Sequence, residues 1–242
     1  GGVVVPVAGR CGGCSTMAEG LALGAARGEG GAGGNRLAMA SSHVCAAGRQ
    51  FRTPLGYGAV RTPTAQWTAT AAGCCLLQPQ GEGVGIAAAT FGRVQDYQVK
   101  DINNMGAAMA PAAASTLLHY FKDTGTEPQE FDCIYTGDLG QVGSQLLREL
   151  LAAEGLLIKN HVDCGCILFD ANEQSVKSGG SGPGCCAAVL CGHILPRLRR
   201  GSPKRVLFTA TGALMSQTTF LQKETIPAVA HLVELRAPEK EK

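Results

Sequence analysis

The chain opens with an apolar run that leads into a glycine-rich turn and then a helix of small residues. Residues 3–7 have the continuous apolar character of a buried strand. The turn after them holds Cys11 and Cys14, and a helix is predicted to begin near residues 14–16. A thiol at a helix N-terminus faces unpaired backbone N–H groups, which favour the thiolate. This strand–turn–helix corner constrains the fold and the chemistry more than any other stretch.

The alternation of apolar runs and helical patterns continues to the end of the chain. Strands are predicted at residues 36–41, 84–94, 131–136, 163–170, 205–211 and 228–236, and helices at 105–122, 141–153 and 185–199. Strands that alternate with helices predict a mostly parallel sheet covered on both faces, and the apolar run at 84–94 indicates a strand buried on both sides. Pro111 is expected to kink or break its helix, whereas Thr16 and Glu19 have the spacing of a capping box.

The chain divides into two similar halves. Each runs strand, small-residue turn, helix and strand, with a boundary near residue 101. We therefore expect one unit over residues 1–100, a second over 101–236, and a disordered charged tail over 237–242. Because the chain lacks an initial Met and begins at the edge of a strand, we expect a fragment whose N-terminal part is missing. Ligands bind such sheets at the carboxyl ends of the strands, where these turns lie.

Composition excludes several classes of protein. Apolar residues make up 45% of the 242 residues, so the chain can bury a core. The net charge of +2 argues against nucleic acid as the main partner. Eleven cysteines, an odd number that includes adjacent pairs, suit a reducing compartment better than a disulfide framework. No apolar run reaches the roughly 18 residues that a transmembrane helix needs.

Several motifs, in the same order along nearly the whole chain, resemble one family. They include GCST at 13–16, SSH at 41–43, NMGAAMAPAAA at 104–114, TGDLG at 136–140, DCG at 163–165, GGSG at 179–182 and TGAL at 211–214. The sequence resembles the stage V sporulation protein AD family. The resemblance implies an α/β, thiolase-like fold, in which two similar βαβ-type halves form a layered α-β-α-β-α arrangement. It also implies that the first crossovers of the N-terminal half are absent.

The family resemblance also implies a function. Its members are associated with uptake of dipicolinic acid (pyridine-2,6-dicarboxylate) into the developing spore, beside membrane-bound sporulation proteins of the same operon. We therefore expect a peripheral protein of the forespore inner membrane that binds this acid, with or without calcium, in its thiolase-like pocket. Thiolase-like proteins are commonly dimers, which suggests a homodimer. No cofactor or resident metal is expected, and the Cys11–Cys14 pair is interpreted as separate thiols and not as a zinc site.

Cys14 is the central candidate residue. A nucleophile needs a base and an oxyanion site, which thiolases supply from turns of the second half. The equivalent turns here, 179–182 and 211–214, hold no acid–base side chain. Ligand binding is therefore favoured, and an acyltransferase with Cys14 as acyl-accepting nucleophile and His43 as its partner is the alternative. A third reading is a scaffold for membrane subunits.

The predicted ligand site gathers residues from both halves: Cys14, Ser15, His43, Arg52, Asp138, Gly179, Gly180 and Ser181. Arg52 is suited to bidentate pairing with a carboxylate, and glycines let the backbone approach a ligand. Asp138 is favoured as a cap of the following helix, with a hydrogen-bond network in the pocket as the alternative. Trp67 is interpreted as a core residue more readily than as a platform for the pyridine ring.

Overall fold

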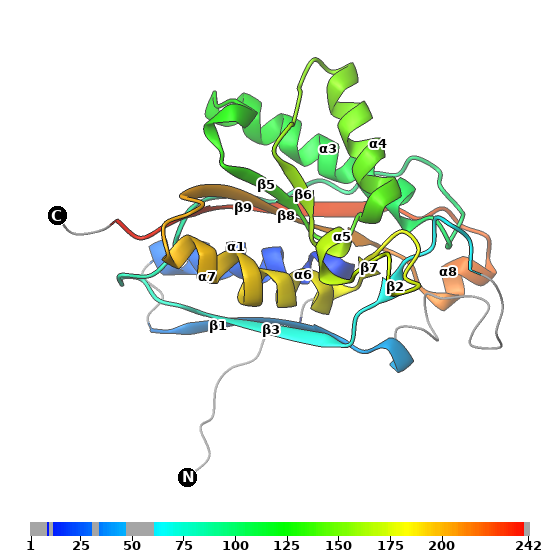
Figure 1. Cartoon of the computed structure of the whole chain (residues 1–242), viewed down its shortest axis with the longest axis horizontal. Coiled ribbons are helices and arrows are strands. Elements are labelled where there is room, and N and C mark those ends of the chain that lie inside the picture. The colour runs from blue at the N-terminus through cyan, green and yellow to red at the C-terminus, as the bar shows by residue number, and fades with distance from the viewer. Residues whose placement is uncertain (1–8, 10–11, 31–33, 47–60, 240–242) are drawn as a thin grey trace, which may run out of the picture.

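Helices and sheets are stacked in layers in the computed structural model of the chain, which describes residues 9, 12–30, 34–46 and 61–239. Figure 1 shows α3 (Met105–Thr124) and α4 (Gly140–Ala153) on one face of a five-stranded sheet. On the other face lie α1 (Thr16–Glu29), α6 (Pro183–Val189) and α7 (Leu195–Arg199). A two-stranded sheet lies on the side of these helices that faces away from the five-stranded sheet.

The five-stranded sheet is mixed. Its order is β4 (Gly85–Thr90), β9 (Ala228–Arg236), β8 (Arg205–Ala213), β5 (Cys133–Thr136) and β6 (His161–Asp163). β5 runs parallel to β6 and β8, whereas β9 is antiparallel to both β8 and β4. The prediction of a mostly parallel sheet is therefore wrong. The segment between β8 and β9 holds only the short helix α8 (Gln217–Leu221), so the chain turns back beside the strand that it has just left.

The core lies on both faces of this sheet. Neighbouring residues on β8 point to opposite sides, since Leu207 packs among the residues of α3 and α4 while Phe208 packs toward α1 and α6. The first side is filled around Tyr120 and Leu147, and the second around Met17. The apolar positions that the sequence shows in these helices are thus the positions that meet the sheet.

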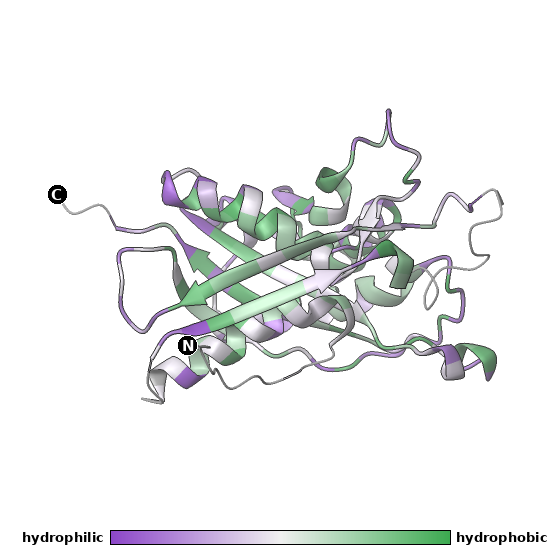
Figure 2. Cartoon of the chain, turned by 90° about the horizontal axis from the view of Figure 1, so that it is seen from below, coloured by the Kyte–Doolittle hydropathy of each residue, from purple (hydrophilic) through white to green (hydrophobic). Residues whose placement is uncertain are grey.

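The two-stranded sheet joins β1 (Arg36–Ser42) and β3 (Ala71–Leu77) in antiparallel register. Its inner face packs on α1 and α6, and at Gly73 a Cβ atom would lie 2.5 Å from the carbonyl oxygen of Ala187. Its outer face exposes Leu37, Met39 and Leu76. Figure 2 looks toward this sheet and shows much of it in the green of apolar residues.

Two strand predictions differ from the structure. The run at 163–170 is not a strand: β6 ends at Asp163, and helix α5 (Cys164–Leu168) follows at once. A short apolar run does not distinguish a strand from a buried helical turn. Residues 84–94 do form a strand at 85–90, but β4 is the edge of its sheet and its residues alternate between exposed and partly buried. The expected burial on both faces is therefore wrong.

The helices confirm most of the predicted pattern and correct two details. α3 continues unbroken through the buried Pro111, so the proline does not divide it. The capping box at α1 is absent: Ser15 occupies the N-cap position without a side-chain cap, and the Thr16 hydroxyl donates to the carbonyl of Gly13, 2.8 Å away. The predicted helix at 185–199 is α6 and α7 joined by a π-helical segment, Leu190–Ile194. The strand predicted at 3–7 lies outside the described residues.

Candidate functional site

A cavity of about 990 Å³ opens at the N-terminal end of α1. Its walls come from the α1 corner, the β1–β3 sheet, the start of α3, the turn before α6 and the segment after β8. The lining is rich in hydroxyl groups and thioethers, contributed by Thr16, Ser41, Thr68, Ser181, Ser216, Thr219, Met39, Met105, Met109 and Met215. Among the described residues, the lining has no charged side chain. Such a surface offers neutral hydrogen-bond donors beside flexible apolar groups.

The α1 corner is held by close contact between two backbone segments. Gly13 adopts a left-handed φ of +60°, and a Cβ atom there would lie 2.9 Å from the carbonyl oxygen of Ala213. A Cβ atom on Gly212 would overlap the carbonyl oxygen of Gly12. Gly212 and Ala213 belong to β8, which continues through the turn predicted there. The end of β8 therefore packs directly on the turn that carries Cys14.

Asp138 connects this corner to the turns of the second half. Its carboxylate is fully buried and accepts from the backbone N–H of Gly182 (2.8 Å), the hydroxyl of Ser181 (3.2 Å) and the hydroxyl of Thr211 (3.0 Å). The thiol of Cys14 also hydrogen-bonds to it. Burial raises the pKa of Asp138, and these hydrogen bonds oppose the rise. Asp138 is thus the hub of a buried network that includes the candidate thiol.

Asp163 performs the capping role that the sequence analysis assigned to Asp138. The N-cap position of α4 is Leu139, without a side-chain cap of its own. The backbone N–H groups of Leu139 and Gly140 instead donate to Asp163 from across the turn, both at 2.9 Å. The prediction of a local cap by Asp138 is therefore wrong, because the carboxylate of Asp163, at the end of the next strand, accepts from the N–H groups at this helix start instead.

A hydrogen-bonded chain lies behind Asp163. The hydroxyl of Thr136 donates to Asp163 (2.6 Å) and lies 2.8 Å from Nε2 of His161. Burial raises the pKa of Asp163 to about 6. Burial, with the charge of Arg148, lowers the pKa of His161 to about 4. The sequence motifs did not single out His161 or reveal Asp163 as a buried acid, although an acidic residue at the end of a strand was the available signal.

Gln66 is a further residue that the sequence analysis did not single out for its role. Its side-chain nitrogen donates to the carbonyl oxygens of Asp138 (2.6 Å) and Gly180 (3.0 Å), and the side chain is buried. Beside it, β2 (Trp67–Thr68) pairs in parallel with β7 (Gly180–Ser181). This short pairing fixes the loop before β3 onto the second-half turns, so that Thr68 and Ser181 both reach the cavity lining.

The predicted site residues divide by position. Cys14 and Ser181 line the cavity, and Asp138 lies directly behind them. Ser15 is buried and donates to the carbonyl of Gly12 (2.6 Å), and Gly180 is engaged in the pairing with β2.

Gly179 is likewise occupied by the loop that precedes β2. Its carbonyl oxygen accepts from the backbone N–H of Trp67 at 2.8 Å, and neither Gly179 nor Gly180 lines the cavity. Both glycines position the wall from behind, through their backbones.

His43, Arg52 and Trp67 have other surroundings. His43 is exposed beyond β1, where its Nδ1 accepts from the N–H of Cys45 (3.2 Å), and it does not line the cavity. Arg52 lies outside the described residues. The guanidinium of Arg61 stacks 3.6 Å from the ring centre of Trp67, so one face of that ring is taken by a cation. Within the described ranges, no group of three or more His, Cys, Asp or Glu side chains could hold a metal ion.

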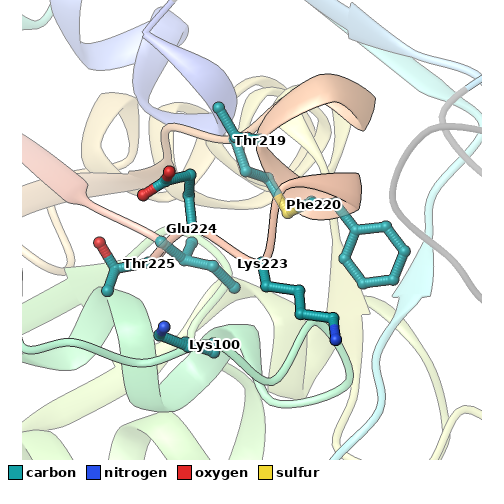
Figure 3. Close-up of a pocket in the computed structure, with 8 residues that line it drawn as sticks. Lys100, Thr219, Phe220, Lys223, Glu224 and Thr225 are labelled. Carbon is teal, nitrogen blue, oxygen red and sulfur yellow. The ribbon is translucent and has the colours of Figure 1, made fainter.

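A smaller cleft adjoins the cavity. Its volume is about 240 Å³, and it shares Met215 and Thr219 with the large cavity. Figure 3 shows Lys100, from the segment before α3, on the same cleft as Lys223 and Glu224, which follow α8. Charged side chains thus lie next to the cavity although its own described lining is neutral.

Solved structures with similar architecture are condensing enzymes. The tetronic acid condensing enzyme AbyA1 matches 93% of this chain and 66% of its own at a TM-score of 0.56 and 14% identity. The 3-oxoacyl-[acyl-carrier-protein] synthase III of Aquifex aeolicus VF5 matches 93% and 65% at a TM-score of 0.53 and 12% identity. OleA of Xanthomonas campestris, bound with cerulenin, matches 93% and 61% at a TM-score of 0.54 and 12% identity. At these identities the likeness establishes the layered, thiolase-like fold.

The sequence matches one family closely. It is 42% identical over 221 residues to stage V sporulation protein AD of Bacillus subtilis (strain 168). The match covers 91% of this chain and 65% of that protein, so the chain spans slightly less than two thirds of its relative. The family model for stage V sporulation protein AD (SpoVAD) matches residues 2–236. The chain with the Cys14 corner and the buried Asp138 network is therefore a member of the SpoVAD family.

Proposed function

We propose that this SpoVAD-family protein binds dipicolinic acid in the cavity beside α1, for uptake of the acid into the developing spore. In this proposal Cys14 is a binding residue and not a nucleophile. The observation that carries the proposal is the hydrogen bond between the Cys14 thiol and the buried carboxylate of Asp138.

A carboxylate is an unfavourable neighbour for a catalytic thiol. A thiolate at Cys14 would lose its hydrogen bond to Asp138 and face a second negative charge. The described lining of the cavity offers no His or Lys to take the proton, and His43 lies elsewhere. The arrangement supports a neutral thiol that forms part of the cavity wall.

The cavity chemistry suits a small, planar, polar acid. Hydroxyl groups of Ser41 and Ser216 are available as donors to carboxylate oxygens, and the thioethers of Met105 and Met109 offer an adaptable apolar surface to an aromatic ring. A dianion also needs a cation, and Arg52 is the proposed partner because a guanidinium binds a carboxylate through two parallel hydrogen bonds. At about 990 Å³ the cavity lies near the upper end of the usual range for ligand pockets.

The proposed setting is the forespore inner membrane. There the protein would act peripherally beside membrane-bound sporulation proteins of the same operon, as a homodimer, with calcium as an accompanying ion to be tested. In the part of the chain that the structure describes, no helix combines the length and apolarity needed to cross a bilayer.

The test is calorimetric titration of the chain with dipicolinate, alone and with Ca²⁺. Wild type is expected to bind, and Cys14→Ala and Arg52→Ala are expected to weaken binding at least several-fold. The matched controls Cys45→Ala and Arg93→Ala change exposed residues that do not line the cavity and should bind as wild type does. Folded wild type that shows no heat of binding with either titrant would rule out the proposal.

The second candidate is an acyltransferase. It is favoured by the condensing-enzyme fold together with the position of Cys14 on the cavity wall. Incubation with acyl-CoA thioesters of several chain lengths, followed by mass spectrometry, would detect an acyl group on Cys14. We expect the residue to remain unmodified, and acylation at Cys14 would favour this candidate instead.

A further inference from the structure

Two cysteines far apart in the sequence meet between the outer sheet and the helix layer. Cys75 lies on the inner face of β3, and Cys191 lies in the π-helical segment that joins α6 to α7. Their sulfur atoms are 3.7 Å apart, in direct contact. Sγ of Cys191 also lies 3.6 Å from the carbonyl oxygen of Cys74. A disulfide needs the two sulfur atoms at about 2.0 Å, so a modest side-chain movement would complete the bond.

The two thiols differ in a way that suits oxidation. Its contact with Cys75 and the positive charge of Arg199 lower the pKa of Cys191, and burial opposes this shift. The same contact and burial raise the pKa of Cys75. Cys191 is also the more exposed of the two. Cys191 is therefore the thiol that a peroxide reaches first, and the buried Cys75 lies in contact with it, which is the relation between an attacking and a resolving cysteine.

We propose that Cys75 and Cys191 form a reversible disulfide when the protein meets a peroxide. The Cys191 thiolate attacks one peroxide oxygen, so that an S–O bond forms, the O–O bond breaks and the departing hydroxide is protonated to water. The Cys75 sulfur then attacks the resulting sulfenic acid. The S–S bond forms, the S–O bond breaks, and the second hydroxide takes the proton that Cys75 releases. In total two thiols lose two electrons and two protons, and hydrogen peroxide becomes two molecules of water.

The cross-link would fasten one wall of the cavity. β3 carries Gly73 and Cys74, both of which line the cavity, immediately before Cys75. A bond from Cys75 to Cys191 ties this strand to the helix layer on its inner side. The inference does not depend on which ligand the cavity takes, because it rests on the contact between the two sulfur atoms and on the exposure of Cys191.

The neighbouring Cys74 supplies a matched control. Successive residues of a strand point to opposite faces, and Cys74 is exposed whereas Cys75 is buried. Cys74→Ser should therefore leave the cross-link intact, while Cys75→Ser and Cys191→Ser should abolish it. Cys191 is only partly buried, so Cys191→Ser tests the proposal even where Cys75→Ser fails to fold.

The experiment treats the native chain with stoichiometric hydrogen peroxide, blocks the remaining thiols by alkylation and maps the peptides by mass spectrometry without reduction. The expected result is a peptide pair joined through Cys75 and Cys191 that a dithiol separates again. The thermal midpoint should rise on oxidation and return on reduction in wild type and Cys74→Ser, and should not respond in Cys191→Ser. A native chain that yields no such pair, or that links Cys74 instead, would overturn the proposal.

Discussion

The chain of hydrogen bonds from His161 through Thr136 to Asp163 predicts two opposite pH dependences of stability within one site. Thr136 donates to Asp163, so its oxygen is left to accept from Nε2–H of a neutral His161. The other ring nitrogen, Nδ1, is buried and finds no hydrogen-bond partner among the described residues. A proton on Nδ1 would therefore be both buried and unpaired, which explains why the pKa of His161 falls to about 4.

The magnitudes follow from the shifts. The pKa of Asp163 rises from 3.8 to about 6, and two units correspond to about 3 kcal/mol. Over that range the folded state holds a proton that the unfolded state has lost, so this carboxyl makes stability fall as pH rises from about 4 to 6. His161 does the reverse. Its folded pKa is about 4 against an ordinary 6.5, so stability rises with pH across this interval. The rise is about 2 to 3 kcal/mol, a magnitude reduced for the solvent screening of a partly exposed ring.

The assay is urea unfolding of wild type, Asp163→Asn and His161→Gln at constant ionic strength from pH 4 to 7. In wild type the two effects largely cancel. Relative to wild type, the free energy of unfolding of Asp163→Asn should increase by about 3 kcal/mol between pH 4 and 7. The amide also changes stability at the turn by an amount that does not depend on pH, and this amount does not affect the comparison across pH. His161→Gln should lose about 2 to 3 kcal/mol over the same range.

Asp138 also has a raised pKa, but it is present in every variant. Asp123→Asn, at an exposed position, is the control and should follow wild type. The assignment of these two protonation states would be refuted if the stability difference between Asp163→Asn and wild type did not change with pH. It would also be refuted if the stability of both variants, relative to wild type, changed in the same direction with pH.

Two further predictions concern other parts of the fold. Glu234 is buried, and although burial opposes the effect, hydrogen bonds from Arg205 (2.8 Å), Tyr120 (2.5 Å) and Arg236 (2.7 Å) lower its pKa to about 2. The stability that this group contributes is present above about pH 4.5 and is lost as pH falls toward 2. In chemical unfolding, Glu234→Gln should therefore lower the free energy of unfolding by about 2 kcal/mol at pH 7 and by progressively less below pH 4. The control substitution Glu154→Gln, at an exposed position, should change stability little at any pH. Gly212→Ala should destabilise the chain by about 3 kcal/mol or more and abolish dipicolinate binding, because the new Cβ would overlap the carbonyl oxygen of Gly12. Gly192→Ala, where nothing lies within 4 Å, should be neutral or slightly stabilising in the same thermal melts, and equal midpoints for the two variants would contradict the close packing of β8 on the α1 corner.

Long periodic elements were predictable from sequence because many residues report the same pattern. The last strand lies at 228–236 as predicted, and the helix predicted at 105–122 ends only two residues later, at Thr124 before Gly125. The family resemblance supplied the layered, thiolase-like fold. Short elements failed: α5 has five residues, and its apolar run has the same appearance as a buried strand.

The site was only partly predictable, because its contacts join residues far apart in the chain. The sequence placed Cys14 and Ser181 in one pocket, and both line the cavity. It could not reveal that Asp163 would reach the helix start that follows Asp138, since that contact depends on the pairing of β6 with β5. The prediction for Arg52 remains a prediction, because that residue lies outside the described part of the chain.

The carboxylate of Asp138 makes its partners interdependent. Cys14, Ser181 and Thr211 all donate to the same group, so substitutions at these positions should be non-additive, each changing the effect of the next. The order of substitutions then matters for an evolving lineage. A change in the turn at Ser181 would leave the thiol bonded to Asp138, and a base gained elsewhere would still have to remove a proton beside a carboxylate. A variant designed for acyl-transfer chemistry at this corner would therefore need Asp138 replaced before a base is added.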